Sequence, residues 1–170
     1  MKFFDNAQES EIWTYGTGLA PQVIRAKKGD VLQVTLDNQL GEATTLHRHG
    51  VRVENKDDGV PGITQEKAVA PGETYQYTVP LYDAGTYRFH THIDTMGQIG
   101  RGLYGIIIVE DDKLPAHDQE RLRALKDYRL DEEGRLIQRF GTMGQKTHGG
   151  YLGNVMTINN IPFPTFEATP

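Results

Sequence analysis

The stretch Ala84-Gly-Thr-Tyr-Arg-Phe-His-Thr-His92 predicts a β-strand that ends in two histidines. Side chains alternate between the two faces of a strand, so residues two apart stand roughly 7 Å from each other on the same face. We therefore expect His90 and His92 to share a face. The same arrangement occurs upstream in Leu46-His-Arg-His-Gly50, so that four of the six histidines form two His-x-His pairs.

Two such strands placed side by side would bring four imidazoles to one patch: His47, His49, His90 and His92. A single histidine in a strand is more often structural. Two same-face pairs favour metal binding, because imidazole is the commonest metal ligand and an unpaired buried imidazole costs desolvation energy. Ligation by histidine alone suits copper, zinc or nickel, and Cu(II) has the highest intrinsic affinity. His117, among charged residues, and His148, in a glycine-rich loop, are weaker candidates.

Alternating or β-branched segments recur along the chain, separated by turns rich in glycine, proline and aspartate. This pattern predicts an all-β antiparallel sandwich or barrel. One short helix is expected over residues 115–126, and the strand over 44–53 would place Val51 and Val53 on the face of its two histidines. The predicted strands of the first part of the chain span residues 11–15, 22–26, 31–36, 44–53, 73–79, 84–92 and 103–109.

Composition excludes several classes of function. The formal net charge is −5, and no basic block interleaved with aromatic residues suggests nucleic-acid binding. No run of about eighteen apolar residues predicts a membrane span. The chain contains no cysteine, which excludes disulfides, thiol catalysis and a copper–thiolate electron-transfer site. The start, Met1-Lys-Phe-Phe-Asp5, has too short an apolar stretch for a signal peptide, so the compartment stays unknown.

Several motifs resemble, in order, those of the multicopper oxidases, which include laccases, bilirubin oxidases and cuprous oxidases. Thr44-Thr-Leu-His-Arg-His-Gly50 resembles the first copper motif and Phe89-His-Thr-His92 the second. The intervening Asp58-Gly-Val-Pro61 and the later Arg101-Gly-Leu-Tyr-Gly105 are also similar to family segments. The resemblance covers residues 12–168 and rests on two copper motifs with the turns between them.

The resemblance implies a cupredoxin-like Greek-key β-sandwich or barrel over residues 1–112, with a C-terminal extension. Residues 113–170 would be a linker and the truncated start of a second cupredoxin domain. The last residues, Phe166-Glu-Ala-Thr-Pro170, lack the turn and second strand that follow comparable strands earlier in the chain. We therefore expect the sequence to end inside that second domain; a frayed terminus is the alternative.

In the family, the first domain supplies half the ligands of a trinuclear copper cluster that reduces dioxygen to water. The resemblance implies that His47 binds the mononuclear (type-2) copper and that His49, His90 and His92 bind the binuclear (type-3) pair. The other ligands come from a C-terminal His-x-His and a His-Cys-His, whose cysteine also holds the type-1 copper. Six histidines and no cysteine cannot supply that set, so the chain alone should not be a competent laccase.

Three further expectations concern single residues. Asp58 matches a family acid thought to relay protons to reduced oxygen, a role that requires a pKa near the working pH; the alternative is a residue that only shapes the Asp-Gly turn. Arg48 and Arg88 stand where the family usually has aromatic residues. Both are expected to alternate away from the histidine face towards solvent, through natural drift or a deliberate redesign of the surface.

Three functions remain open. The chain could be an isolated copper-binding domain without turnover, or a homo-oligomeric copper oxidase whose cluster forms between chains. It could also be a non-catalytic storage or assembly module, or an engineered scaffold. The implied partners are the missing cupredoxin domains or a second copy of the chain, together with dioxygen. Members of the family are often periplasmic or secreted, whereas this chain could be cytoplasmic or a mature region with a new initiating methionine.

Overall fold

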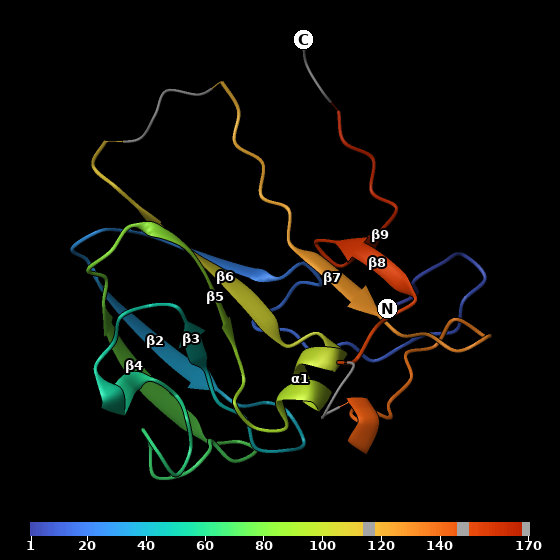
Figure 1. Ribbon diagram of the computed structural model, residues 1–170, viewed down its shortest axis with the longest axis horizontal. Coiled ribbons are helices and arrows are strands. Elements are labelled where there is room, and N and C mark those ends of the chain that lie inside the picture. The colour runs from blue at the N-terminus through green and yellow to red at the C-terminus, as the bar shows by residue number, and fades with distance from the viewer. Residues whose placement is uncertain (114–117, 146–149, 168–170) are drawn as a thin grey trace.

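A computed structural model describes residues 1–113, 118–145 and 150–167 (Figure 1). The first part of the chain folds into two sheets. The four-stranded sheet has the order β1-β6-β5-β3, and the two-stranded sheet pairs β2 with β4. The bounds are β1 Gln22–Lys27, β2 Val31–Asp37, β3 His47–His49, β4 Thr74–Pro80, β5 Gly85–His90 and β6 Tyr104–Glu110.

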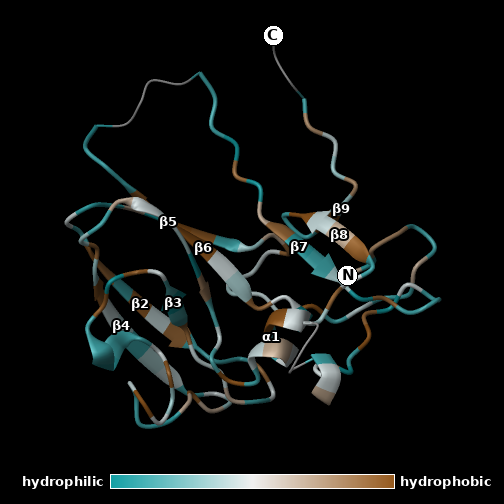
Figure 2. Cartoon of the chain, in the orientation of Figure 1, coloured by the Kyte–Doolittle hydropathy of each residue, from teal (hydrophilic) through white to brown (hydrophobic). Residues whose placement is uncertain are grey.

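The apolar core lies between these two sheets. Tyr77 and Val79 enter it from β4, and Phe89 and Ile107 enter it from β5 and β6. The hydrophobic run of β6 is the brown segment of that strand in Figure 2. β1 runs parallel to β6, whereas β5 pairs antiparallel with both β6 and β3. This is the predicted all-β sandwich, and it makes β3 an edge strand that carries one histidine pair.

The short helix is not where we predicted it. Residues 118–124 form no helix and the next residues form the strand β7, Leu125–Tyr128; the helix of the domain is α1, Thr95–Arg101. Two glycines in a seven-residue segment conceal a helix in the sequence, since glycine has a low helix propensity. Tertiary packing stabilises it: a Cβ on Gly100 would lie 2.4 Å from the ring of Phe140.

The first histidine strand is shorter than predicted. β3 ends at His49, because Gly50 adopts a φ of +87° and Val51 donates a backbone hydrogen bond to the Arg48 carbonyl at 3.3 Å. Val51 and Val53 therefore leave the strand, and the 3-10 helix η1, Asn55–Asp57, follows. Residues 11–15 do not form the predicted strand.

The C-terminal segment forms its own three-stranded sheet from β7, β8 (Val155–Ile158) and β9 (Ile161–Pro162). A second cluster of buried side chains accompanies it, and the N-terminal lead-in joins that cluster through Phe3. One face of this sheet is largely apolar, with exposed side chains at Leu125, Met156 and Ile161, and Phe163 is exposed just beyond the end of β9. Among the described residues, no helix has the length and apolar character needed to span a bilayer.

The two unusual arginines differ from the prediction in opposite ways. Arg48 does point away from the histidines, but that side of β3 is the sandwich interior, and the residue is 0% exposed. Its guanidinium lies 4.5 Å from the centre of the Tyr77 ring, and its Nη1 donates to the Leu46 carbonyl at 2.8 Å. Arg88 is exposed as expected, yet it pairs with His49 and so lies on the histidine face.

Arg48→Met should stabilise the domain. Burial lowers the pKa of the Arg48 guanidinium, and its Nε and Nη2 have no hydrogen-bond partner among the described residues. An unsatisfied buried donor costs about 1–3 kcal/mol, which we expect to exceed the contacts with Tyr77 and Leu46. The free energy of unfolding, from urea denaturation of the metal-free chain, should rise by about 1–2 kcal/mol.

Arg88→Met is the matched control, because this arginine is exposed on the neighbouring strand and its removal should change stability by less than about 0.5 kcal/mol. A loss of stability in Arg48→Met would show that the ring contact and the single hydrogen bond outweigh desolvation.

Candidate metal site

The pairing of β3 with β5 brings the two histidine motifs together. His47 lies directly opposite His90 in the antiparallel register, and His49 lies on the same face. The ligand nitrogens of these three residues are all within 4.8 Å of one another. His92 lies beyond the end of β5, but the centre of its ring is 4.9 Å from that of His47. All four predicted ligands therefore converge.

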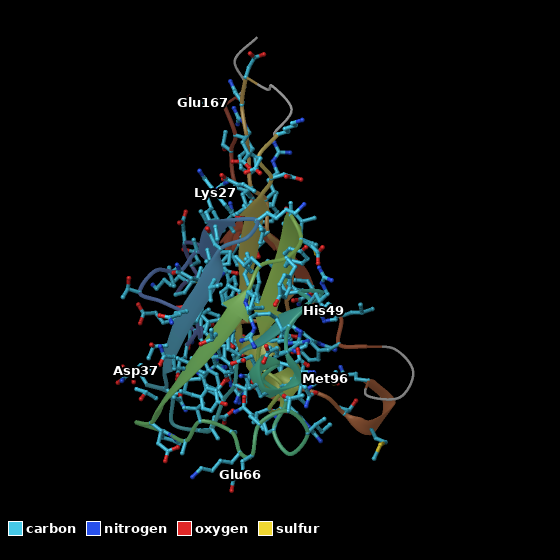
Figure 3. All side chains as sticks on the ribbon, turned by 90° about the vertical axis from the view of Figure 1, so that its left-hand side faces the viewer. Lys27, Asp37, His49, Glu66, Met96 and Glu167 are labelled. Carbon is cyan, nitrogen blue, oxygen red and sulfur yellow. The ribbon has the colours of Figure 1, made fainter. Side chains whose placement is uncertain are left out.

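The four rings differ in exposure. His90 is buried, with 5% of its surface exposed, and His47 is half-buried. His49, labelled in Figure 3, and His92 are exposed. The cluster thus has an inner side against the sheet and an outer side that faces solvent.

Hydrogen bonds indicate which ring nitrogen carries the proton in two of the histidines. The Nδ1 of His47 lies 2.8 Å from the Asp58 carbonyl, and the Nδ1 of His90 lies 2.8 Å from the Thr91 carbonyl. A carbonyl accepts only, so each Nδ1 donates its proton and each Nε2 keeps a free lone pair, the usual arrangement of a metal-binding histidine. The Nε2 of His90 is buried and has no partner among the described residues. A metal ion would satisfy that nitrogen, so the residues fit a metal.

Burial favours the neutral form of two of the rings, those of His90 and His92. Burial lowers the pKa of His90, with smaller contributions from the nearby His47 and Arg88. Burial also lowers the pKa of His92. A metal competes with protons for the ligand nitrogen, so rings that resist protonation keep the ligand form at lower pH.

Asp58 contacts His47 through both its backbone and its side chain. Besides the carbonyl contact, its Oδ1 lies 3.1 Å from the Nδ1 of His47. The close approach depends on Gly59, which has a φ of +79° and whose Cβ, if present, would lie 2.2 Å from the Leu46 carbonyl oxygen. From the sequence, the resemblance implied a proton-relay role for Asp58, but its contact with His47 was not predicted.

Sequence reasoning missed two polar contacts that support the site. The Thr45 hydroxyl accepts a hydrogen bond from the His92 backbone N–H, and Gln98 of α1 accepts one from the Thr44 hydroxyl. Thr44, Thr45 and Gln98 are all buried. The available signal in the sequence was the pair of threonines shortly before the first histidine motif. The other two candidates, His117 and His148, lie outside the described residues.

The two sheets form a cupredoxin-like β-sandwich, and two neighbouring strands and the residues just after β5 present four imidazoles that could bind a metal. The profile of the family described as "Multicopper oxidase" matches residues 2–114. The chain therefore belongs to the multicopper oxidase family.

Relatives agree with this assignment. The chain is 44% identical over 152 residues to the iron transport multicopper oxidase FET3 of Candida albicans, covering 86% of the chain and 24% of the relative. It is 34% identical to copper resistance protein A of Escherichia coli, covering 88% and 26%. A crystal structure of a multi-copper oxidase from Pseudomonas thermotolerans matches with a TM-score of 0.82 at 34% identity, covering 89% of this chain and 36% of that one. The chain thus spans about a quarter of the length of these curated relatives.

Proposed function

We propose that this chain is a copper-binding domain that supplies half the ligands of an oxygen-reducing copper cluster. The ligands are His47, His49, His90 and His92. Following the resemblance to the family, His47 serves the mononuclear copper and the other three serve the binuclear pair. Copper bound here would supply the redox chemistry of dioxygen reduction.

The observation that carries this proposal is the convergence of the four rings, with the tautomers of His47 and His90 set by backbone carbonyls. Two Nδ1 atoms donate to carbonyl groups, and the buried Nε2 of His90 lacks a partner in the described structure. A structural role alone would leave that nitrogen unsatisfied, which is rare for a buried polar atom. Copper is the metal favoured for imidazole ligands by intrinsic affinity and by the family.

The domain is proposed to be inactive as an oxidase by itself. The chain has no cysteine, so it cannot provide the thiolate of a type-1 copper. His49 and His92 are exposed, which leaves the outer side of the cluster open to ligands from elsewhere. We propose that residues 1–112 form the cupredoxin domain and that residues 113–170 begin a second one. The separate β7-β8-β9 sheet supports this division, while the buried cluster beside it also includes Phe3 of the N-terminal lead-in.

A second candidate, favoured by the same exposed rings, is an oxidase that forms its cluster between two copies of the chain. Two histidine faces in contact would supply eight imidazoles, the number used by the family cluster. Such an assembly would require a closed symmetric interface.

Asp58 is proposed as a proton relay to the cluster. Its carboxylate lies beside His47, half-buried and at the rim of the histidine face. Asp58→Asn, measured in an assembly that consumes oxygen, is the variant that tests this role.

The proposal is tested by loading the chain with copper and measuring the molar mass of the copper-bound species. The metal-free chain is titrated with Cu(II), separated by size-exclusion chromatography with light scattering, and assayed for copper and for oxygen consumption with a reductant. We expect a monomer that retains about one or two coppers and consumes no oxygen. A chain that retains no copper would overturn the proposal. An oligomer with about three coppers per pair and oxygen consumption would favour the second candidate, and copper binding at other residues would favour a storage or scaffold protein.

A further inference from the structure

His92 differs from the other three histidines because no β-ladder fixes it. His47 and His49 belong to β3, and His90 is the last residue of β5. The register between these two strands stops at the pair His47–His90. His92 follows two residues later and is exposed, yet its ring approaches that of His47 edge to face. A contact outside the ladder must hold its backbone in place.

Thr45 makes that contact. Its Oγ1 accepts a hydrogen bond from the backbone N–H of His92 at 2.9 Å, across 47 positions of sequence. Thr45 is itself immobilised, because it is 0% exposed and its carbonyl accepts a hydrogen bond from the Tyr15 hydroxyl at 2.9 Å. A fixed, buried acceptor thus holds the main chain at the point where the last histidine leaves the sheet.

A second link lies further along the chain. Gln98 of α1 is fully buried, accepts from the Thr44 hydroxyl at 2.8 Å and donates to the Ala43 carbonyl at 2.8 Å. This link anchors the helix that follows the second histidine pair to the segment that precedes the first. It acts six residues away from His92, whereas Thr45 acts on the peptide group of His92 itself.

We propose that Thr45 is a positioning residue that holds His92 within reach of the metal bound by His47. The inference rests on the proposed function, because it requires that a metal binds at the histidine cluster. Without the Thr45 acceptor, the His92 peptide has no ladder partner that would keep its ring beside the others. Supporting contacts of this kind typically change metal affinity by about ten- to a hundred-fold when they are removed.

The test uses Thr45→Val, which preserves the branched shape and removes the acceptor. Cu(II) affinity is measured by competition with a chelator, and the number of coordinated imidazoles by pulsed electron paramagnetic resonance. We expect binding weaker by on the order of tenfold and one coordinated imidazole fewer than in the wild type. Thr45→Ser keeps the hydroxyl and should restore both readouts.

A double-mutant cycle separates positioning from general destabilisation. If Thr45 acts through His92, then adding Thr45→Val to His92→Ala should weaken binding by less than about twofold. An equal loss in both backgrounds would overturn the proposal, and so would wild-type affinity in Thr45→Val alone.

If Thr45→Val fails to fold, hydrogen exchange of the His92 amide in the metal-free wild type decides the matter. Slow exchange supports the contact with Thr45, and exchange at the rate of an open amide overturns it. If the wild type binds no copper, the proposed function fails, whereas the exchange measurement still tests the Thr45 contact on its own.

Discussion

His90→Ala combined with His92→Ala should abolish tight copper uptake. The pair removes the buried ring whose Nε2 lacks a partner and the ring beside His47, leaving two of the four imidazoles. We expect Cu(II) affinity, measured by chelator competition, to fall by more than about a hundred-fold, beyond the loss typical of an outer-shell contact. Since His92 is exposed and His90 carries an unsatisfied nitrogen, the free energy of unfolding of the metal-free chain should change by only about 1 kcal/mol.

The matched control removes the two histidines that are not among the four proposed ligands, as His117→Ala with His148→Ala. It deletes the same number of imidazoles and should leave affinity unchanged. Unchanged uptake in the first double variant would place the metal elsewhere and contradict the proposed site.

Gly59→Ala should destabilise the domain more than other single changes near the site. The added methyl group would approach the Leu46 carbonyl oxygen and carbon at 2.2 and 2.7 Å, and both atoms belong to backbone that leads into β3. The positive φ adds conformational strain for any residue with a Cβ. Together these effects should lower the free energy of unfolding by about 3 kcal/mol, or the melting temperature by about 6–12 °C.

Gly62→Ala isolates the contribution of the contact. Gly62 also has a positive φ, +74°, but nothing lies within 4 Å of its Cβ position. We expect it to lose only about 1 kcal/mol through conformational strain. Copper affinity should fall in Gly59→Ala alone, because the Asp58 carbonyl would move away from His47. Equal destabilisation in the two variants would show that the approach to Leu46 is unimportant.

The two-residue period of β-strands allowed the histidine face to be predicted. Two His-x-His pairs in strand-like segments required only that the strands be neighbours, and the pairing of His47 with His90 confirms that they are. The same period should have placed Arg88, two residues before His90, on the histidine face; assigning it to the opposite face was an error of counting. Arg48 was assigned to the correct face, but a sandwich buries that face even on an edge strand.

The remaining features depend on contacts between distant residues. Asp58 lies 11 positions from the histidine it contacts and Thr45 lies 47 positions from His92, and no local pattern encodes either pairing. Helix α1 carries Gly97 and Gly100 without a clear apolar period, so packing rather than propensity determines it. Local sequence thus predicted most of the strands and the shared face of the histidines, whereas the contacts that orient these side chains became evident only in three dimensions.

The largely apolar face of the β7-β8-β9 sheet affects how a purified sample should behave. The exposed side chains of Leu125, Met156 and Ile161 on this face, with Phe163 just beyond it, are apolar groups of the kind that promote self-association. Light scattering could then reveal multimers that owe nothing to the imidazoles. Such multimers would persist in a chelating buffer and dissociate on dilution or in mild detergent, whereas particles joined through copper would break up when the metal is withdrawn.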